Sequence, residues 1–176
     1  GLTTPLDRSV VEHILPVGGT ILGSSRTNPV KMEGGVDAIR ATMERLGIDA
    51  LLAIGGEDTL GVATHLNTVG IKVVGAPKTI DNDLSATDYT FGFDTAVQIA
   101  VDACDRLATT GASHHRAMIV EVMGRHAGWI ALHTGMAASA HVTLLPEEEY
   151  DADAVAATIA KVAERGEAPL VVISEG

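Results

Sequence analysis

The chain alternates apolar runs of strand length with segments in which apolar residues recur at helical spacing. Helical spacing is clear at Val36, Ile39, Met43 and Leu46, and Gly47 then supplies a typical helix end. A nearly continuous apolar run follows at residues 48–54 and is typical of a strand that helices cover on both faces. Further helices are predicted at about residues 60–67, 92–109, 129–138 and 151–165, and further strands at 72–75, 117–122, 142–145 and 170–173.

Five predicted strands that alternate with helices indicate a doubly wound α/β fold, with a predominantly parallel sheet and helices on both faces. The first 17 residues are irregular apart from a short helix, for which Ser9 is the predicted cap. At 176 residues the chain has the length of one domain, so we expect residues 1–176 to form a single α/β region.

The composition excludes several classes of partner. The chain has 12 Lys and Arg against 23 Asp and Glu, a net charge of −11, and one Trp, two Tyr and two Phe, so a nucleic-acid surface is not expected. Apolar runs stay well below membrane-spanning length and no signal pattern opens the chain, so we expect a cytoplasmic protein without a membrane partner. The single cysteine, Cys104, shares an apolar helix stripe and is expected to pack in the core.

The stretch Pro77-Lys78-Thr79-Ile80-Asp81-Asn82-Asp83 gathers a cation, a hydroxyl and two carboxylates directly after a predicted strand. Open α/β sheets bind ligands at the carboxyl ends of their strands, so this stretch has the outline of a reaction centre. One of its two aspartates can act as a base while the other orients an acceptor hydroxyl. The alternative is a turn in which Asp and Asn side chains bond nearby backbone amides.

A loop rich in glycine and hydroxyl groups, Gly18-Gly19-Thr20-Ile21-Leu22-Gly23-Ser24-Ser25-Arg26, precedes the first clear helix. Its glycines allow the backbone to approach an anion closely, and Arg26 would be the charge partner of that anion. The alternative is an ordinary surface loop.

Two glycines and two acids, Gly55-Gly56-Glu57-Asp58-Thr59, stand between a predicted strand and a predicted helix. A tight turn followed by the free amides of a helix N-terminus favours a phosphate group. Adjacent acids would repel that phosphate unless a divalent cation stood between them, and Mg²⁺ is the expected ion. The alternative is that Glu57 and Asp58 only offset the helix dipole.

A third glycine loop with a cation, Met123-Gly124-Arg125-His126-Ala127-Gly128-Trp129, follows the strand predicted at residues 117–122. It implies another ligand-facing segment at the same edge of the sheet. The histidines lack the spacing of metal ligands, so we expect His114 and His115 to be solvated and His126 and His133 to pack or cap.

In order and approximate spacing, these four motifs resemble those of the 6-phosphofructokinase family, and the resemblance spans essentially the whole chain. The version of the motifs here is similar to the pyrophosphate-using branch of that family found in actinobacteria. The resemblance implies transfer of a phosphoryl group from pyrophosphate to the C1 hydroxyl of fructose 6-phosphate, with Mg²⁺. The alternatives are an ATP-dependent enzyme and, more remotely, a non-catalytic regulatory subunit, against which the presence of Asp81 argues.

For the acceptor side, the resemblance implies that Asp81 is the general base and that Thr79 and Asp83 hold the reacting groups, with Ile80 in the same substrate-binding stretch. Arg125 would bind the sugar phosphate and also take part in catalysis. The remaining sugar-binding residues that it implies are Met123, Gly124 and Glu175. It also implies that Arg116 reaches the site of a neighbouring subunit, so a homodimer or homotetramer is expected.

For the donor side, the resemblance implies that Arg26 steadies the donor and that Lys78 stabilises charge on the departing phosphate. ATP-using members generally have Gly where Asp58 stands, so the carboxylate of Asp58 would exclude the α-phosphate of ATP. Glu57 stands where an aspartate commonly serves Mg²⁺, which leaves direct and water-mediated coordination both open. Gly55, Gly56 and Thr59 complete the implied donor-binding set. Family segments that would precede and follow these motifs are missing, so we expect the chain to be a fragment of a longer one.

Overall fold

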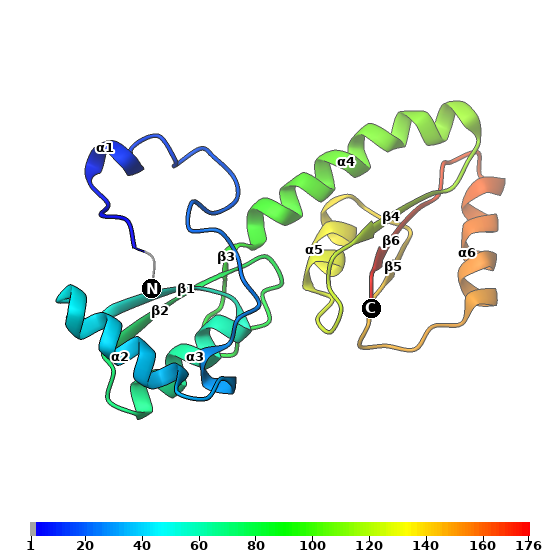
Figure 1. The fold of residues 1–176 in the computed structure, drawn as a ribbon. Helices are drawn as coiled ribbons and strands as arrows, with labels where there is room; N and C mark the ends of the chain where they lie inside the picture. The colour runs from blue at the N-terminus through cyan, green and yellow to red at the C-terminus, as the bar shows by residue number, and fades with distance from the viewer. Residues whose placement is uncertain (1–2) are drawn as a thin grey trace. The chain divides into compact units, whose positions relative to one another are not determined.

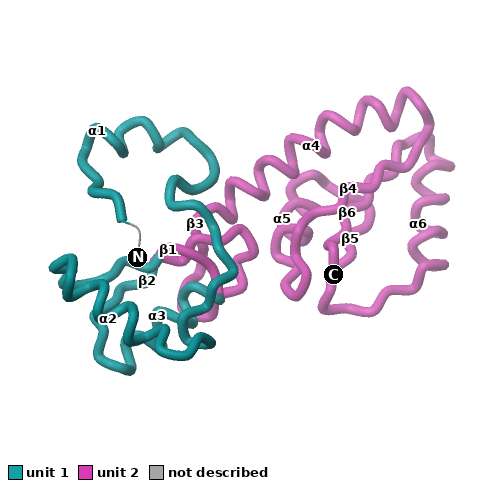
Figure 2. The backbone as a smooth tube through the Cα atoms, viewed as in Figure 1, with its two compact units in different colours: residues 1–53, 58–75 teal, residues 54–57, 76–176 magenta. Residues whose placement is uncertain are grey.

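The computed structural model describes residues 3–176 and divides into two compact units (Figure 2). Unit 1 comprises residues 1–53 and 58–75, and unit 2 comprises residues 54–57 and 76–176. Within the described residues, six strands form two three-stranded sheets, where the sequence predicted five strands. Every strand pair whose register is defined is parallel, and helices separate most of the strands along the chain, which confirms the predicted α/β class.

The first sheet has the strand order β1-β2-β3 (Figure 1). Strands β1 (Leu51–Gly55) and β2 (Val73–Thr79) begin in unit 1, and β3 (Phe91–Gly92) is a two-residue strand that the sequence did not predict. Strand β2 runs four residues beyond the predicted end at Gly75, and it includes Lys78 and Thr79 because these two residues pair with β3.

The helices of the N-terminal half are α1 (Arg8–Val11), the 3-10 helix η1 (Pro29–Lys31), α2 (Gly35–Leu46) and α3 (Glu57–Thr68). The prediction for α2 is confirmed, including its end at Gly47 with φ of 64°. The predicted cap of α1 is wrong, because Asp7 accepts from the amide of Val10 while Ser9 donates to Asp7. The Ser9 hydroxyl is also the main reason why the pKa of Asp7 lies below its usual value.

Strand β1 is not covered on both faces as its apolar sequence predicted. Leu52 and Ile54 are 63% and 49% exposed, whereas Leu51 and Ala53 on the other face are half-buried. The apolar run therefore identified the strand correctly but not the number of its covered faces.

Unit 2 contains the second sheet, in which β4 (Met118–Val122) and β5 (Val142–Leu144) flank β6 (Leu170–Ser174). Its helices are α4 (Phe93–His114), α5 (Trp129–Ala137) and α6 (Ala152–Glu164), and Figure 1 shows α5 and α6 on opposite sides of this sheet. Helix α4 continues past the predicted end at Thr109. The predicted cap of α6 is confirmed, because Asp151 accepts from the amides of Asp153 and Ala154.

The core of unit 2 forms around Cys104, Ala131 and Val172. Cys104 is 1% exposed, which confirms its predicted packing role, and burial raises the pKa of its thiol. Trp129, the first residue of α5, is 44% exposed.

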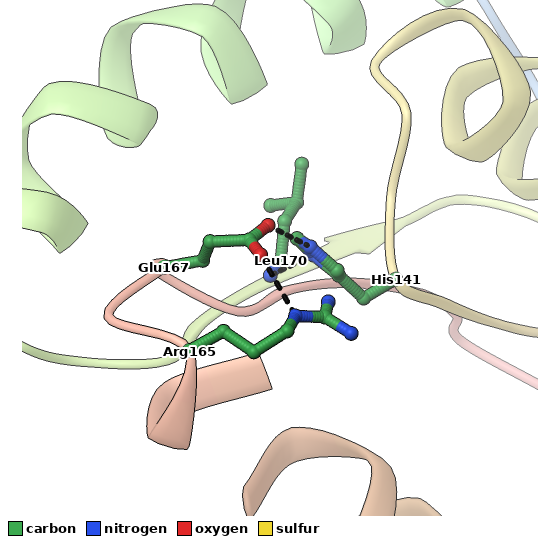
Figure 3. A network of polar contacts seen from close by, with 4 residues as sticks. All are labelled: His141, Arg165, Glu167 and Leu170. Atoms are coloured by element: carbon green, nitrogen blue, oxygen red, sulfur yellow. Dashed lines mark hydrogen bonds and ion pairs between the residues drawn. The ribbon is translucent and has the colours of Figure 1, made fainter. Parts of the chain in front are cut away.

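A polar network joins the end of α6 to the start of β6 (Figure 3). Nε of Arg165 donates to Oε1 of Glu167 over 2.8 Å, and Nε2 of His141 lies 3.7 Å from Oε2 of the same glutamate. The amide of Leu170 donates to Nδ1 of His141 over 3.1 Å. These contacts fix the turn that leads into the central strand of the sheet.

Among the helices of residues 3–176, none combines the length and the apolar character that a membrane crossing requires.

Candidate active site

The carboxyl end of β2 carries the residues that the sequence singled out as a reaction centre. Thr79 is the last residue of β2, and its hydroxyl Oγ1 donates to Oδ2 of Asp81 over 3.1 Å. The same hydroxyl accepts from the amide of Asp81 over 3.2 Å. A Cβ built on Gly92 would lie 3.4 Å from Ile80, so Ile80 packs against the end of β3. The half-buried Asp81 is therefore held in one orientation at the tip of the strand.

The turn after Asp81 is tied to the chain eight residues further on. Asn82 has a left-handed backbone with φ of 53°, and its Oδ1 accepts from the amide and the hydroxyl of Thr90 over 2.9 and 3.3 Å. Its Nδ2 donates to the carbonyl of Asp88 over 3.3 Å. Thr90 is only 5% exposed, so the anchor point is part of the interior. Asn82 thus fixes the backbone between the two candidate carboxylates, Asp81 and Asp83.

A cavity of about 730 Å³ opens beside this turn within unit 2. Its wall includes Glu57 and Asp83, which the sequence assigned to metal and substrate binding. His126 and His133 line the same cavity, and the ring of His133 meets that of Phe93 edge-on at 5.1 Å. Its remaining lining residues are Asn82, Leu84, Ser85, Thr87, Asp88, Tyr89, Ala127 and Trp129.

The glycine turn after β1 lies beside the end of β2. Gly55 is buried, and a Cβ built on Gly56 would lie 3.4 Å from Cβ of Thr79. Helix α3 begins at Glu57, three residues earlier than predicted, so Glu57, Asp58 and Thr59 form its first turn. The position of Glu57 and Asp58 at a helix N-terminus is consistent with both interpretations of these acids, as ligands of a cation and as partners of the helix dipole.

A second cavity, of about 360 Å³, lies within unit 1. It brings together three residues of the predicted donor set, Arg26, Asp58 and Thr59. Lys31 of η1 lines it as well, and no sequence motif pointed to that lysine. The floor is apolar and is formed by residues of β1, β2 and α3, among them Ala53, Val62, Ala63, Leu66 and Val73.

The loop between β4 and α5 carries the predicted sugar-binding residues Met123, Gly124 and Arg125. Met123 is 53% exposed and Arg125 is exposed. The chain after β6 lies against this loop, because the amide of Glu175 donates to the carbonyl of Val122 over 3.0 Å. The structure therefore brings Glu175 to the same sheet edge as the loop.

Arg116 lies apart from that group. It is exposed and precedes β4, whereas Met123, Gly124 and Arg125 follow β4. The five residues of β4 span roughly 16 Å. Arg116 is thus at the opposite end of this sheet from Arg125 and Glu175.

The cations assigned to ligand binding have no carboxylate partners in the described part of the chain. The three ion pairs found there involve His13, His141 and Arg165 with Glu12 and Glu167. Arg26, Lys78, Arg116 and Arg125 remain available to anionic groups of a ligand.

The residues present fit a magnesium ion of the kind held jointly with a substrate. No group of three or more His, Cys, Asp or Glu side chains within residues 3–176 is placed to hold a metal by itself. Mg²⁺ is usually held by one or two carboxylates together with substrate phosphates and water. Glu57 and Asp83, which line one cavity, provide carboxylates in that number.

Sequence reasoning missed the residues that brace these segments, namely Asn82 as an anchor, Glu147 and Ser174. Each one acts through a hydrogen bond to a residue 8 to 50 positions away. Local motifs carry no signal for such contacts, although a left-handed backbone is a common role for Asn in a turn.

Comparison with known proteins gives a consistent result. The family model described as Phosphofructokinase matches residues 1–176. The chain is 61% identical over 176 residues to a pyrophosphate--fructose 6-phosphate 1-phosphotransferase of Amycolatopsis mediterranei, covering 100% of this chain and 52% of that protein. It is 54% identical over 175 residues to ATP-dependent 6-phosphofructokinase 3 of Streptomyces coelicolor, covering 97% of this chain and 50% of that protein.

Among solved structures, the phosphofructokinase of Pichia pastoris in the T-state matches with a TM-score of 0.87 and 30% identity. That match covers 97% of this chain and 20% of the yeast chain. The chain thus spans about half the length of the Amycolatopsis and Streptomyces proteins named above.

Proposed function

We propose, because this chain belongs to the phosphofructokinase family, that the protein moves a phosphoryl group from pyrophosphate to the C1 hydroxyl of fructose 6-phosphate. The product is fructose 1,6-bisphosphate, and the reaction is a reversible step of glycolysis in the cytoplasm. The main support for this proposal is the hydrogen bond between Thr79 and Asp81, because it holds the Asp81 carboxylate in one orientation at the end of a strand.

Asp81 acts as the general base. Oδ2 is occupied by the Thr79 hydroxyl, so Oδ1 is the atom that accepts the proton of the C1 hydroxyl. As that proton leaves, the sugar oxygen forms a bond to the terminal phosphorus of the donor. The bond between this phosphorus and the bridging oxygen breaks, and its electron pair stays on the departing phosphate.

Lys78 and Arg125 stabilise the negative charge that develops during this transfer. Lys78 is the last residue but one of β2, and it stabilises the departing phosphate. Arg125 binds the acceptor together with Met123, Gly124 and Glu175, which lie at one edge of the second sheet. The protein is net acidic, and within residues 3–176 these cations have no carboxylate partners, so they are available to an anionic substrate.

Magnesium, when bound, supplies positive charge that offsets the negative charge of the donor's phosphate oxygens. Glu57 would hold the ion, directly or through water, and Asp83 lines the same cavity. Gly55 and Gly56 allow the backbone to turn tightly before the amides of the first turn of α3, which favour a phosphate group.

The cavity in unit 1 supports pyrophosphate as the donor. Arg26 and Thr59 offer donors to phosphate oxygens, while Asp58 presents a carboxylate in the same space. A unit charge facing another at 4 Å costs about 1 to 4 kcal/mol, from bulk water to a near-surface dielectric. At the upper figure, repulsion of a third phosphate would favour pyrophosphate over ATP by roughly a thousandfold.

Arg116 is proposed to serve the site of a neighbouring subunit in a homodimer or homotetramer. Its place at the far end of β4 from Arg125 supports this role. Mixed subunits test it, because an Asp81→Asn subunit and an Arg116→Met subunit, each inactive alone, should regain activity in about a quarter of the sites of a dimer. Failure of the mixed enzyme to regain activity would contradict the shared site.

The experiment that tests the function is an initial-rate assay of the full-length protein with fructose 6-phosphate and either pyrophosphate or ATP. We expect kcat/KM to be higher with pyrophosphate by at least about 100-fold. Efficient use of ATP would overturn the donor and leave the acceptor chemistry standing. No turnover with either donor would overturn the proposed activity.

A further inference from the structure

We infer that Ser174 and Glu147 are positioning residues that brace the loop of residues 123–128 in the conformation that binds the sugar phosphate. The inference rests on the proposed function, which assigns Met123, Gly124 and Arg125 of this loop to the acceptor. It adds two residues that lie outside every motif of the sequence.

Ser174 anchors the first half of the loop. It is the last residue of β6, it is 3% exposed, and it pairs in register with Val122 at the end of β4. Its hydroxyl donates to the carbonyl oxygen of Gly124, two residues beyond β4. The contact therefore continues the attachment of β4 to β6 past the last pair of the sheet.

Gly124 can accept this contact only because it has no side chain. Its φ of 138° is a conformation that favours glycine. A Cβ at this position would lie 2.6 Å from both the carbonyl oxygen of Ala127 and Oγ of Ser174. The loop thus folds back on itself directly over the Ser174 hydroxyl.

Glu147 anchors the other end of the loop. Its Oε1 accepts from the amide of Gly128 over 2.8 Å, and Gly128 is the N-cap of α5. A glycine cap has no side chain to accept a hydrogen bond, so the carboxylate of Glu147 satisfies one free amide of the helix start. A Cβ on Gly128 would lie 2.8 Å from both Glu147 and Pro146, which shows how closely this segment approaches the loop.

The two braces hold the ends of the loop and leave its middle exposed. Arg125 and His126 lie between the anchors and are exposed, so their side chains are accessible to a ligand while the two anchors hold the backbone. Removal of one brace would let the loop sample other conformations, and binding of the sugar phosphate would then have to restore order. We expect an effect on sugar-phosphate binding that the donor does not share.

Steady-state kinetics of the full-length protein separate these effects. We expect Ser174→Ala and Glu147→Ala to raise KM for fructose 6-phosphate roughly three- to tenfold, the value of one hydrogen bond. KM for pyrophosphate should stay within about twofold. Glu147→Gln should behave as the unmodified protein does, because its amide oxygen still accepts from Gly128.

Ser113→Ala is the matched control. It also removes a serine hydroxyl bonded to a backbone carbonyl, that of Thr109, but on the surface of α4. We expect it to change neither KM. An unchanged KM for fructose 6-phosphate in both Ser174→Ala and Glu147→Ala, or an equal rise for both substrates, would overturn the inference.

Hydrogen exchange keeps the inference testable if the proposed reaction itself fails. The amides of residues 124–128 should exchange faster in Ser174→Ala and Glu147→Ala by roughly three- to tenfold, and Ser113→Ala should leave them unchanged. Unchanged exchange in these amides would refute the bracing role whatever the substrate proves to be.

Discussion

The hydroxyl Oγ1 of Thr79 donates to Oδ2 of Asp81 over 3.1 Å and accepts from the amide of Asp81 over 3.2 Å. A single side chain therefore fixes both the backbone and the carboxylate of the proposed base. Thr79 is the last residue of β2 and pairs with Gly92, so the sheet holds Thr79 in place and thereby sets the orientation of Asp81.

Loss of the Thr79 hydroxyl should slow the reaction. In Thr79→Val the shape of the side chain is kept, but Asp81 loses its donor and gains freedom to rotate. We expect kcat to fall by about tenfold, which corresponds to a hydrogen bond of about 1.4 kcal/mol. Thr79→Ser retains the hydroxyl and should keep most of the activity in the same assay. Equal rates for the valine variant and the unmodified protein would contradict the orienting role.

Removal of the Asp58 carboxylate should widen the choice of donor. In Asp58→Gly the cavity beside Arg26 and Thr59 loses its negative charge, so the repulsion of a further phosphate disappears. We expect the ratio of kcat/KM for ATP over that for pyrophosphate to rise between about 5- and 1,000-fold. Asp49→Gly, which removes an acid outside this cavity, is the control and should leave the ratio unchanged. A ratio that does not move in Asp58→Gly would show that the carboxylate does not select the donor.

Asn82 should contribute to the stability of the fold. Asn82→Ala loses the bonds to Thr90 and Asp88 and also places alanine in a left-handed conformation, so we expect a loss of about 1 to 3 kcal/mol in the free energy of unfolding. Asn82→Gly removes only the side-chain bonds, and its difference from the alanine variant isolates the backbone cost. Denaturant unfolding of the two variants measures both quantities. Identical stability of Asn82→Ala and the unmodified protein would contradict the anchoring role.

The network at the end of α6 should make stability depend on pH. The hydrogen bond from Arg165 lowers the pKa of Glu167 below its usual 4.5, so the ionised form favours folding. That contribution is present above pH 4.5 and is lost as the pH falls through the lower folded-state value. Because the pair is exposed, we expect the unmodified protein to exceed Glu167→Gln in Tm by only about 1 °C at pH 7. The difference should vanish under more acidic conditions.

Glu164→Gln is the matched control for this measurement, since Glu164 belongs to the same helix end and takes part in none of the ion pairs found in the described chain. Its Tm should follow that of the unmodified protein at every pH. A Tm difference for Glu167→Gln that stayed constant from pH 7 to pH 3 would contradict the role of the ionised carboxylate.

The sequence predicted those features that local signals encode. Helix α2 and its end at Gly47 followed from apolar spacing and one glycine, and the start of α6 followed from Asp151. The two-residue strand β3 has no periodic pattern of its own, because it exists only through its pairing with Lys78 and Thr79. For the same reason the predicted end of β2 fell too early.

The same distinction between local and distant signals applies to the residues of the candidate site. The motifs around Asp81, Asp58 and Arg125 could be recognised because their chemistry is concentrated in short stretches. Their supports could not, since the partner of Gly124 is Ser174, 50 residues away, and the partner of Gly128 is Glu147. Such contacts arise only when parallel strands bring distant loops to one edge of a sheet.

The most direct test of the account is the turnover of Asp81→Asn in the full-length protein, measured beside its affinity for fructose 6-phosphate. Asparagine keeps an oxygen that accepts from Thr79 but cannot take a proton from the sugar. We predict that kcat falls by at least about 1,000-fold, within the usual range for a general base, while the Kd for fructose 6-phosphate changes less than about threefold. Turnover within tenfold of the unmodified protein would contradict the assignment of Asp81 as the base.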